Sequence, residues 1–199
     1  MRLILLRHGE STWNADGRMQ GTADPPLSQA GRAQTRELAP LLRRLTPDVV
    51  VTSDLLRARQ TAEELGLAGA RADPRWREAG LGRWTGRLAE EVVAEEPGAH
   101  DGWLEGSAAP LGGEAFAETC GRIAEAIAAL AAAGAERPLV VTHGGPIRAA
   151  CATLAGLPRS GLVAVPTASL TEIAVPDGGP GRVVAFGVTS RGPVRPAPP

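Results

Sequence analysis

Two histidines in this sequence stand directly after short apolar runs that end in a polar residue. His8 follows Leu3-Ile4-Leu5-Leu6-Arg7, His143 follows Leu139-Val140-Val141-Thr142, and a glycine comes after each histidine. Such runs are typical of strands buried on both faces of a parallel sheet, and these sheets bind ligands at the carboxyl ends of their strands. A histidine at such a position can act as a nucleophile or a base. The alternative is that the strand simply ends in polar residues that have no function.

Arginine is the second residue type that could do chemistry here. Arg7 precedes His8 directly, and Arg57 falls in the first turn of the helix expected after residues 49–53. The planar guanidinium binds phosphate oxygens in pairs, and helix N-termini attract anions. We therefore expect Arg7 and Arg57 to hold one dianionic group; the alternative for Arg57 is a plain surface position. His100, in a polar stretch, is expected to be a solvated loop residue.

The elements that position these residues alternate between strand and helix. Ser28 predicts the N-cap of one helix, which leucines at spacings of three and four continue through residues 38–45 and which Pro47-Asp48 ends. Further strands are expected at 49–53, 139–142, 170–175 and 183–188, the last two at an edge, and helices at 56–65 and 114–134. This order predicts an α/β fold: a three-layer α/β/α sandwich whose central sheet is mostly parallel, with helices on both faces.

The stretch from about residue 74 to 113 has no regular periodicity apart from a short helix at 88–95. We expect it to form a cap excursion over the carboxyl edge of the sheet, within one domain covering residues 1–190. The Pro-rich tail 191–199 is expected to be disordered. The pattern leaves open whether Trp13, Met19, Trp84 and Trp103 line a substrate mouth or only pack.

Composition excludes several classes of function. The chain of 199 residues has a formal net charge of −1, and all 21 of its basic residues are arginine, so no basic field points to nucleic acid or to an acidic membrane. Cys120 and Cys151 are too few for a disulfide framework or a zinc site. No apolar leader precedes the first strand and no run of 18 apolar residues occurs, so we expect a soluble, cytoplasmic protein.

Longer motifs follow one another in order from residue 2 to about residue 175. They are Leu6-Arg7-His8-Gly9-Glu10 with Trp13-Asn14 downstream, Arg18-Met19-Gln20-Gly21, Asp24-Pro25-Pro26-Leu27-Ser28, residues 53–62 (SDLLRARQTA), residues 77–86 (REAGLGRWTG), Gly112-Gly113-Glu114 and residues 140–145 (VVTHGG). Together they resemble the histidine phosphatase superfamily, and more narrowly its phosphoglycerate-mutase-like branch. Ala115 departs from the family pattern, which has serine there, and Asp54 stands where proline is common.

The resemblance implies a role for each matched residue. His8 would be the nucleophile, transiently phosphorylated on a ring nitrogen, and Glu78 would protonate the leaving alcohol and then deprotonate the attacking water. The remaining catalytic residues, which would surround the phosphoryl oxygens, are Arg7, Arg57 and His143. The phosphate- or substrate-binding residues would be Asn14, Gln20, Gly21 and the backbone at Gly144. The resemblance implies no metal and no cofactor.

This chemistry agrees with general principles. Phosphoryl transfer needs positioning and charge neutralisation, which two arginines and a histidine supply. The nucleophilic imidazole has to be neutral, as the reference pKa of about 6.5 permits. Glu10 is the rival acid by position, and we expect it instead to make a structural hydrogen bond in its loop.

The sequence thus predicts a metal-independent phosphomonoesterase that hydrolyses a small organic phosphate, sugar-like or of another alcohol. One alternative is a cofactor-dependent phosphoglycerate mutase, which the absence of tyrosine and the short excursion disfavour. The other is a non-catalytic phospho-ligand-binding module on the same fold, which the full catalytic set disfavours. The expected partner is a small-molecule phosphomonoester, with no nucleic acid and no membrane, and a homodimer is left open.

Overall fold

The computed structural model describes residues 1–67 and 69–193. Within them the strands form one seven-stranded sheet in the order β3-β2-β4-β1-β5-β6-β7. The first four are parallel neighbours and the last three are antiparallel, so the α/β class is confirmed with a mixed sheet. The strands are β1 (Arg2–Arg7), β2 (Val49–Thr52), β3 (Arg71–Ala72), β4 (Pro138–Thr142), β5 (Ser169–Ala174), β6 (Arg182–Thr189) and β7 (Gly192–Pro193).

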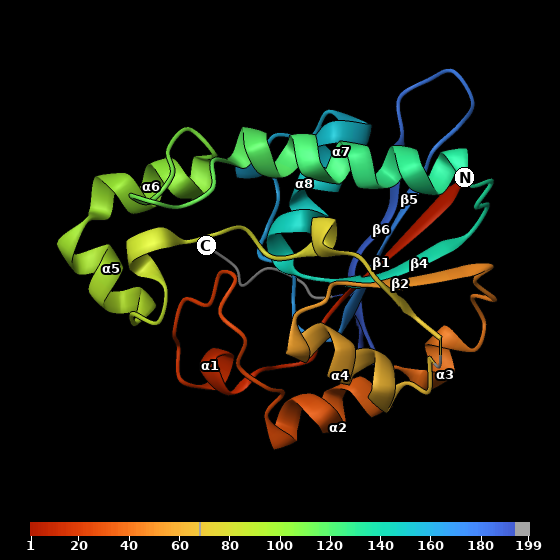
Figure 1. Cartoon of the computed structure of the whole chain (residues 1–199), viewed down its shortest axis with the longest axis horizontal. Coiled ribbons are helices and arrows are strands. Elements are labelled where there is room, and N and C mark those ends of the chain that lie inside the picture. The colour runs from red at the N-terminus through yellow and green to blue at the C-terminus, as the bar shows by residue number, and fades with distance from the viewer. Residues whose placement is uncertain (68, 194–199) are drawn as a thin grey trace.

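Helices cover both faces of the sheet, as the sequence predicts. In Figure 1, α2, α3 and α4 lie below the sheet and α7 and α8 lie above it, while α5 and α6 project to one side. The helices are α1 (Thr12–Ala15), α2 (Gln29–Glu37), α3 (Ala39–Leu42), α4 (Leu56–Glu64), α5 (Ala89–Glu95), α6 (Pro97–Glu105), α7 (Phe116–Ala132) and α8 (Gly144–Ala155), with 3-10 turns at Pro74–Trp76, Gly82–Trp84 and Arg159–Gly161.

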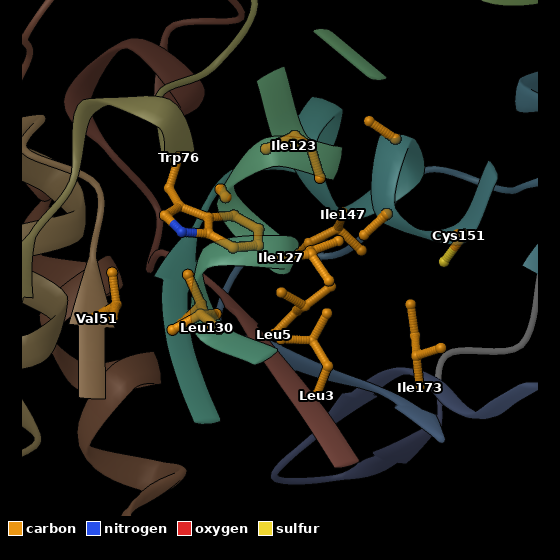
Figure 2. Close-up of a cluster of buried hydrophobic side chains, with 14 of the residues drawn as sticks. Leu3, Leu5, Val51, Trp76, Ile123, Ile127, Leu130, Ile147, Cys151 and Ile173 are labelled. Carbon is orange, nitrogen blue, oxygen red and sulfur yellow. The ribbon is translucent and has the colours of Figure 1, made fainter. Parts of the chain in front are cut away.

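Strand β1 lies in the middle of the sheet and contributes to the core on both sides. Leu3 and Leu5 pack with residues of α7 and α8 in the cluster drawn in Figure 2, and Ile4 and Leu6 pack against α2, α3 and α4. All four side chains are buried, because successive side chains of a strand point to opposite faces. Full burial of each stabilises the fold by about 1.5–3 kcal/mol, which fixes the strand in place.

The pairing of β1 with β4 sets the level of the two histidines. Arg7 is the register partner of Thr142, so His8 and His143, the next residues of the two strands, lie side by side at the carboxyl edge. The backbone N–H of His8 donates to the carbonyl of Thr142 at 3.0 Å, which continues the ladder to this point. The two strand ends that the sequence predicts to carry the chemistry therefore lie together at one edge of the sheet.

Two expectations about the elements are wrong. The helix predicted through residues 38–45 is interrupted: α2 ends at Glu37 and α3 begins at Ala39 with Pro40 in its first turn. Pro40 has no N–H to donate to the preceding turn, so one continuous helix cannot pass it. The strands expected at residues 170–175 and 183–188 are not edge strands, because β5 is hydrogen-bonded between β1 and β6, and β6 between β5 and β7.

The cap, by which we mean α5 and α6, contains a helix that the sequence pattern did not reveal. Helix α6 begins at Pro97 and ends before Gly106, whose φ of 85° is the left-handed conformation common after helices. His100 lies on this helix and forms a cluster with the rings of Trp84 and Trp103, at centroid distances of 6.2 and 5.8 Å. The expectation of a solvated loop histidine is therefore wrong.

The structure differs from expectation in two further segments, the start of the excursion at Trp76 and the start of the C-terminal tail. Trp76, expected in the excursion, is fully buried in the main core below α7. The tail was expected to be disordered from residue 191, yet Gly192–Pro193 form β7 because Thr189 and Val188 of β6 pair with them. Residues 194–199 of that tail lie outside the described residues.

Prediction for the fold: Gly31→Ala should lower the free energy of unfolding by at least about 2 kcal/mol in urea denaturation. A Cβ at Gly31 would lie 1.9 Å from the carbonyl oxygen of Glu10, so α2 and the loop after His8 would have to separate. Gly121→Ala is the matched control. It is a helical glycine of α7 with open space around it, and alanine there should be neutral or stabilising by up to about 1 kcal/mol. Equal effects of the two substitutions would contradict the close packing of α2 on this loop.

Candidate active site

A cavity of about 280 Å³ lies at the carboxyl edge of the sheet, between the two histidine-bearing strands and the cap. Its lining contains eight of the nine residues singled out from the sequence: Arg7, His8, Asn14, Gln20, Gly21, Arg57, Glu78 and Gly144. The ninth, His143, is fully buried directly behind His8, with the two ring centroids 5.0 Å apart. The structure thus brings the whole predicted set together.

His8 is held in one tautomer by its two neighbours. Its Nδ1 lies 2.6 Å from the carbonyl oxygen of Gly9, and Arg57 Nε donates to its Nε2 at 3.2 Å. A guanidinium can only donate, so Nε2 carries the lone pair and Nδ1 carries the proton. Burial, followed by the charges of Arg57 and Arg7, lowers the pKa of His8 well below 6.5. A neutral imidazole with its lone pair on Nε2 therefore lies beside the cavity.

The two arginines beside His8 are held by backbone carbonyls. Arg57 donates to the carbonyls of Ala23 at 2.7 Å and Gly21 at 2.8 Å, and Arg7 donates to the carbonyl of Val165. Burial lowers the pKa of Arg57 to about 10, which leaves it charged at neutral pH. Because a carbonyl does not neutralise the guanidinium, both positive charges remain available to an anion in the cavity.

His143 has one ring nitrogen in use and one without a partner. Its Nε2 lies 2.8 Å from the hydroxyl oxygen of Ser53, the residue that follows β2. Its Nδ1 is buried and has no hydrogen-bond partner among the described residues. Burial, with the charge of Arg57 next in importance, lowers its pKa well below 6.5. An unpaired buried nitrogen costs free energy unless a ligand satisfies it.

Glu78 reaches the cavity from the loop between Trp76 and the cap. Its carboxylate accepts the backbone N–H of Gly145 at 3.1 and 3.2 Å and that of Ala79 at 2.9 Å. A Cβ at Gly145 would lie 2.2 Å from Glu78 Oε1, so only glycine admits the carboxylate there. The first turn of α8 thus positions the carboxylate.

The loop that carries Glu78 is fixed on both sides. Arg77 forms a two-pronged ion pair with Asp54 at 2.7 and 2.5 Å, and the N–H of Gly80 donates to Glu114 at 3.2 Å. Asp54, which departs from the family pattern, therefore has a structural partner here. These two contacts hold the loop in place, and the N–H groups of Gly145 and Ala79 hold the carboxylate itself.

Glu10 lies in its loop, and the amide side chains of Asn14 and Gln20 line the cavity, as the sequence suggested. Glu10 accepts the hydroxyl of Ser28 at 2.6 Å and is absent from the cavity lining, so its expected loop hydrogen bond is confirmed. Ser11 donates through its hydroxyl to the side-chain oxygens of Asn14 at 3.0 Å and Gln20 at 2.7 Å. Each amide therefore keeps its NH₂ group to donate elsewhere.

The structure also adds lining residues that sequence reasoning missed. Three further arginines face the cavity, namely Arg18, Arg148 and Arg159. Arg148 lies within two turns of His143 on α8, a spacing that indicates the same end of the helix, whereas Arg159 had no local signal. Of the residues left open above, Met19 and Trp103 line the cavity, and Trp13 and Trp84 do not.

The described residues contain neither a metal-binding cluster nor a helix that could span a membrane. Across residues 1–67 and 69–193, no group of three or more His, Cys, Asp or Glu side chains is arranged to hold a metal ion. None of the helices in this part of the chain has the length and apolar character needed to cross a membrane.

Comparison with known proteins gives consistent matches. The family model of the histidine phosphatase superfamily (branch 1) matches residues 3–189. Glucosyl-3-phosphoglycerate phosphatase of Mycolicibacterium vanbaalenii is 41% identical over 169 residues, which cover 79% of this chain and 75% of that protein. A probable phosphoglycerate mutase of Salmonella paratyphi A is 34% identical over 164 residues, covering 79% and 76%. A solved mycobacterial glucosyl-3-phosphoglycerate phosphatase with VO3 has a TM-score of 0.86 and 37% identity, covering 94% of this chain and 98% of that chain.

Prediction for the two histidines: the free energy of unfolding should fall as pH drops below about 6.5, the pKa of histidine in the unfolded chain. Both folded pKa values lie below that value, so the unfolded state binds more protons in this window. The slope should approach about 2.7 kcal/mol per pH unit for two groups, measured by urea denaturation. His143→Gln should remove about half of that slope. An unchanged slope in this variant would contradict a neutral, buried His143.

Proposed function

The chain belongs to the histidine phosphatase superfamily (branch 1) and is a phosphatase, and on that basis we propose a more specific activity. It hydrolyses the phosphate ester of a small organic alcohol, without a metal ion, through a phosphohistidine on Nε2 of His8. One observation carries this proposal: a neutral His8 holds its lone pair on Nε2 beside two arginines, and neither arginine forms an ion pair with a carboxylate of the described residues.

In the first step, His8 Nε2 attacks phosphorus, and the bond from phosphorus to the alcohol oxygen breaks. Glu78 donates a proton to that leaving oxygen, since an alkoxide is a poor leaving group without one. The positive charge that develops on the imidazole is stabilised through the Nδ1–H, which already donates to the Gly9 carbonyl. Arg7 and Arg57, which line the cavity, bind the phosphoryl oxygens, and the unpaired Nδ1 of His143 behind His8 is the further group proposed to contact them.

In the second step, the carboxylate of Glu78 accepts a proton from water, and the water oxygen attacks phosphorus. The bond from phosphorus to Nε2 breaks, and its electron pair returns to the ring, so His8 is again neutral. The same carboxyl group therefore acts as an acid and then as a base, and the proton balance closes over the cycle. The cavity arginines supply the charge neutralisation that a metal ion supplies in other phosphatases.

The substrate is proposed to be sugar-like. Glucosyl-3-phosphoglycerate phosphatases, the relatives with 41% and 39% identity, support this by name. The mutase alternative draws support from the relative named as a probable phosphoglycerate mutase, at 34% identity. The two activities differ in the acceptor, because a mutase returns the phosphoryl group to an alcohol and a phosphatase passes it to water.

Prediction for the intermediate: the protein should hydrolyse p-nitrophenyl phosphate in excess EDTA, and ³²P-labelled substrate should label His8. Alkaline denaturation should preserve the label and acid should remove it, because the phosphorus–nitrogen bond is acid-labile. His8→Ala should lower turnover at least about 10³-fold and abolish labelling. Activity that EDTA removes and Mg²⁺ or Zn²⁺ restores would contradict the metal-free mechanism. Transfer of label to an added alcohol in preference to water would favour the mutase.

Prediction for the acid: Glu78→Gln should slow the phosphorylation step of an alkyl phosphate by about 10²–10⁴-fold. The same step with p-nitrophenyl phosphate should fall much less, since p-nitrophenolate leaves without a proton. Single-turnover kinetics are needed, because Glu78 also acts in dephosphorylation. Glu10→Gln is the matched control and should show no dependence on the leaving group, as Glu10 lies outside the cavity. The reverse pattern in these two variants would reassign the acid.

A further inference from the structure

A partly buried ion pair contacts the loop that carries Glu78. Arg122 of α7 donates through Nε and Nη2 to the two carboxylate oxygens of Glu114, at 3.0 and 2.8 Å. The side chains of Arg122 and Glu114 are only 21% and 22% exposed. Neither of them belongs to the described lining of the cavity, so the pair does not touch the substrate directly.

The third nitrogen of Arg122 binds the backbone of this loop. Nη1 donates to the carbonyl of Arg75 at 2.5 Å and to that of Arg77 at 3.0 Å. The carbonyl between them, that of Trp76, accepts the hydroxyl of Thr142 at 2.7 Å. Three successive carbonyls are thus paired with side chains of α7 and β4, and buried carbonyls need such partners. The path of the chain through these residues is therefore set by side chains of the core.

The Arg122–Glu114 pair holds the backbone on both sides of Glu78. The carbonyl of Arg77 belongs to the peptide unit that leads into Glu78, and Gly80 follows two residues later. The N–H of Gly80 donates to the Glu114 carboxylate at 3.2 Å, and the carbonyl of Gly80 accepts the N–H of Glu114 at 2.8 Å. A single ion pair thus contacts the chain directly before the proposed acid and shortly after it.

The helix that carries Arg122 offers the loop a fixed point. Ile123, the next residue of α7, is fully buried, and it belongs to the same core cluster as Trp76 (Figure 2). A guanidinium on such a helix presents its donors in a planar fork, with one edge on a carboxylate and the remaining nitrogen on two carbonyls. A lysine ammonium has one nitrogen and cannot reproduce this arrangement.

We propose that Arg122, together with Glu114, is a positioning residue for the general acid, and that it keeps the carboxyl group of Glu78 within reach of the leaving oxygen. This inference rests on the proposed function for the role of Glu78. Proton transfer requires hydrogen-bond reach, and a misplacement of about 1 Å can cost about 10²-fold in rate. The N–H groups of Gly145 and Ala79 orient the carboxylate, whereas the ion pair fixes the backbone from which it extends.

Loss of Arg122 should affect the substrates whose leaving group needs a proton. In single-turnover measurements, Arg122→Gln should slow phosphorylation of the enzyme by glycerol 2-phosphate about 10- to 100-fold. The same step with p-nitrophenyl phosphate should change less than about threefold, because p-nitrophenolate leaves without a proton. Arg122→Lys, which keeps the charge but not the fork, should recover part of the loss. Equal slowing with both substrates would indicate general damage to the site and would overturn the proposal.

A double variant determines whether Arg122 acts through Glu78. The Glu78→Gln protein has no acid left to position, so adding Arg122→Gln should slow glycerol 2-phosphate by less than about a further threefold. An arginine that contributes independently would instead multiply the two losses. That result would also overturn the proposal.

Arg32→Gln is the matched control. Arg32 of α2 pairs with Glu64 of α4 at 2.6 Å, its side chain is 34% exposed, and it does not line the cavity. Its loss should leave the ratio of the two phosphorylation rates unchanged. If circular dichroism shows that Arg122→Gln does not fold, Glu114→Gln decides, because it weakens the same pair and should shift the ratio in the same direction by at least about threefold. An unchanged ratio in Glu114→Gln would then count against the proposal.

The Glu78→Gln protein separates this inference from the proposed function. If Glu78→Gln shows the dependence on the leaving group and Arg122→Gln does not, the acid keeps its role and only the positioning role fails. If Glu78→Gln itself shows no such dependence, the assignment of the acid fails, and the inference about Arg122 falls with it.

Discussion

The site depends on keeping a histidine uncharged between two arginines. In a buried position each additional positive charge is expensive, and Arg7 and Arg57 already occupy the space around His8. The ring therefore stays neutral, and the Gly9 carbonyl takes the one proton that it carries. A phosphate dianion reverses this balance: once it lies between the arginines, a positive imidazole is no longer penalised. The same charges that favour the neutral nucleophile thus stabilise the state it reaches after attack.

The fold supplies these charges from elements that have little freedom to move. His8 and His143 follow paired central strands, and Arg57 lies in the first turn of α4, directly after β2. Glu78 has no strand to hold it, and its loop is instead tied by Arg77 to Asp54 and by Gly80 to Glu114. Rigid strand ends therefore position the two histidines, while an ion pair and a hydrogen bond position Glu78. In the proposed mechanism, a displacement of either by about 1 Å would separate the nucleophile from the acid.

The sequence predicted the parts of this arrangement that local patterns encode. Apolar runs identified β1, β2 and β4, and residues directly after those runs, such as His8 and His143, had to share one edge. The pattern failed where long-range contacts decide. Helix α6 has no clear apolar periodicity, because its residues pack on an aromatic cluster with Trp84 and on a cavity. Arg159 reaches the cavity only through the return of the chain after α8, and no spacing rule anticipates that.

The position of β1 has a consequence for how the protein acquires its site during synthesis. This first strand is hydrogen-bonded between β4 and β5, and the amino group of Met1 donates to the carbonyl of Val175, 174 residues away. A ribosome makes β1 well before its two neighbours β4 (Pro138–Thr142) and β5 (Ser169–Ala174). The nascent chain consequently carries an apolar strand without partners for most of its synthesis, and the dominance of non-local pairing makes folding slow. The imidazole pair is among the last features of the molecule to assemble.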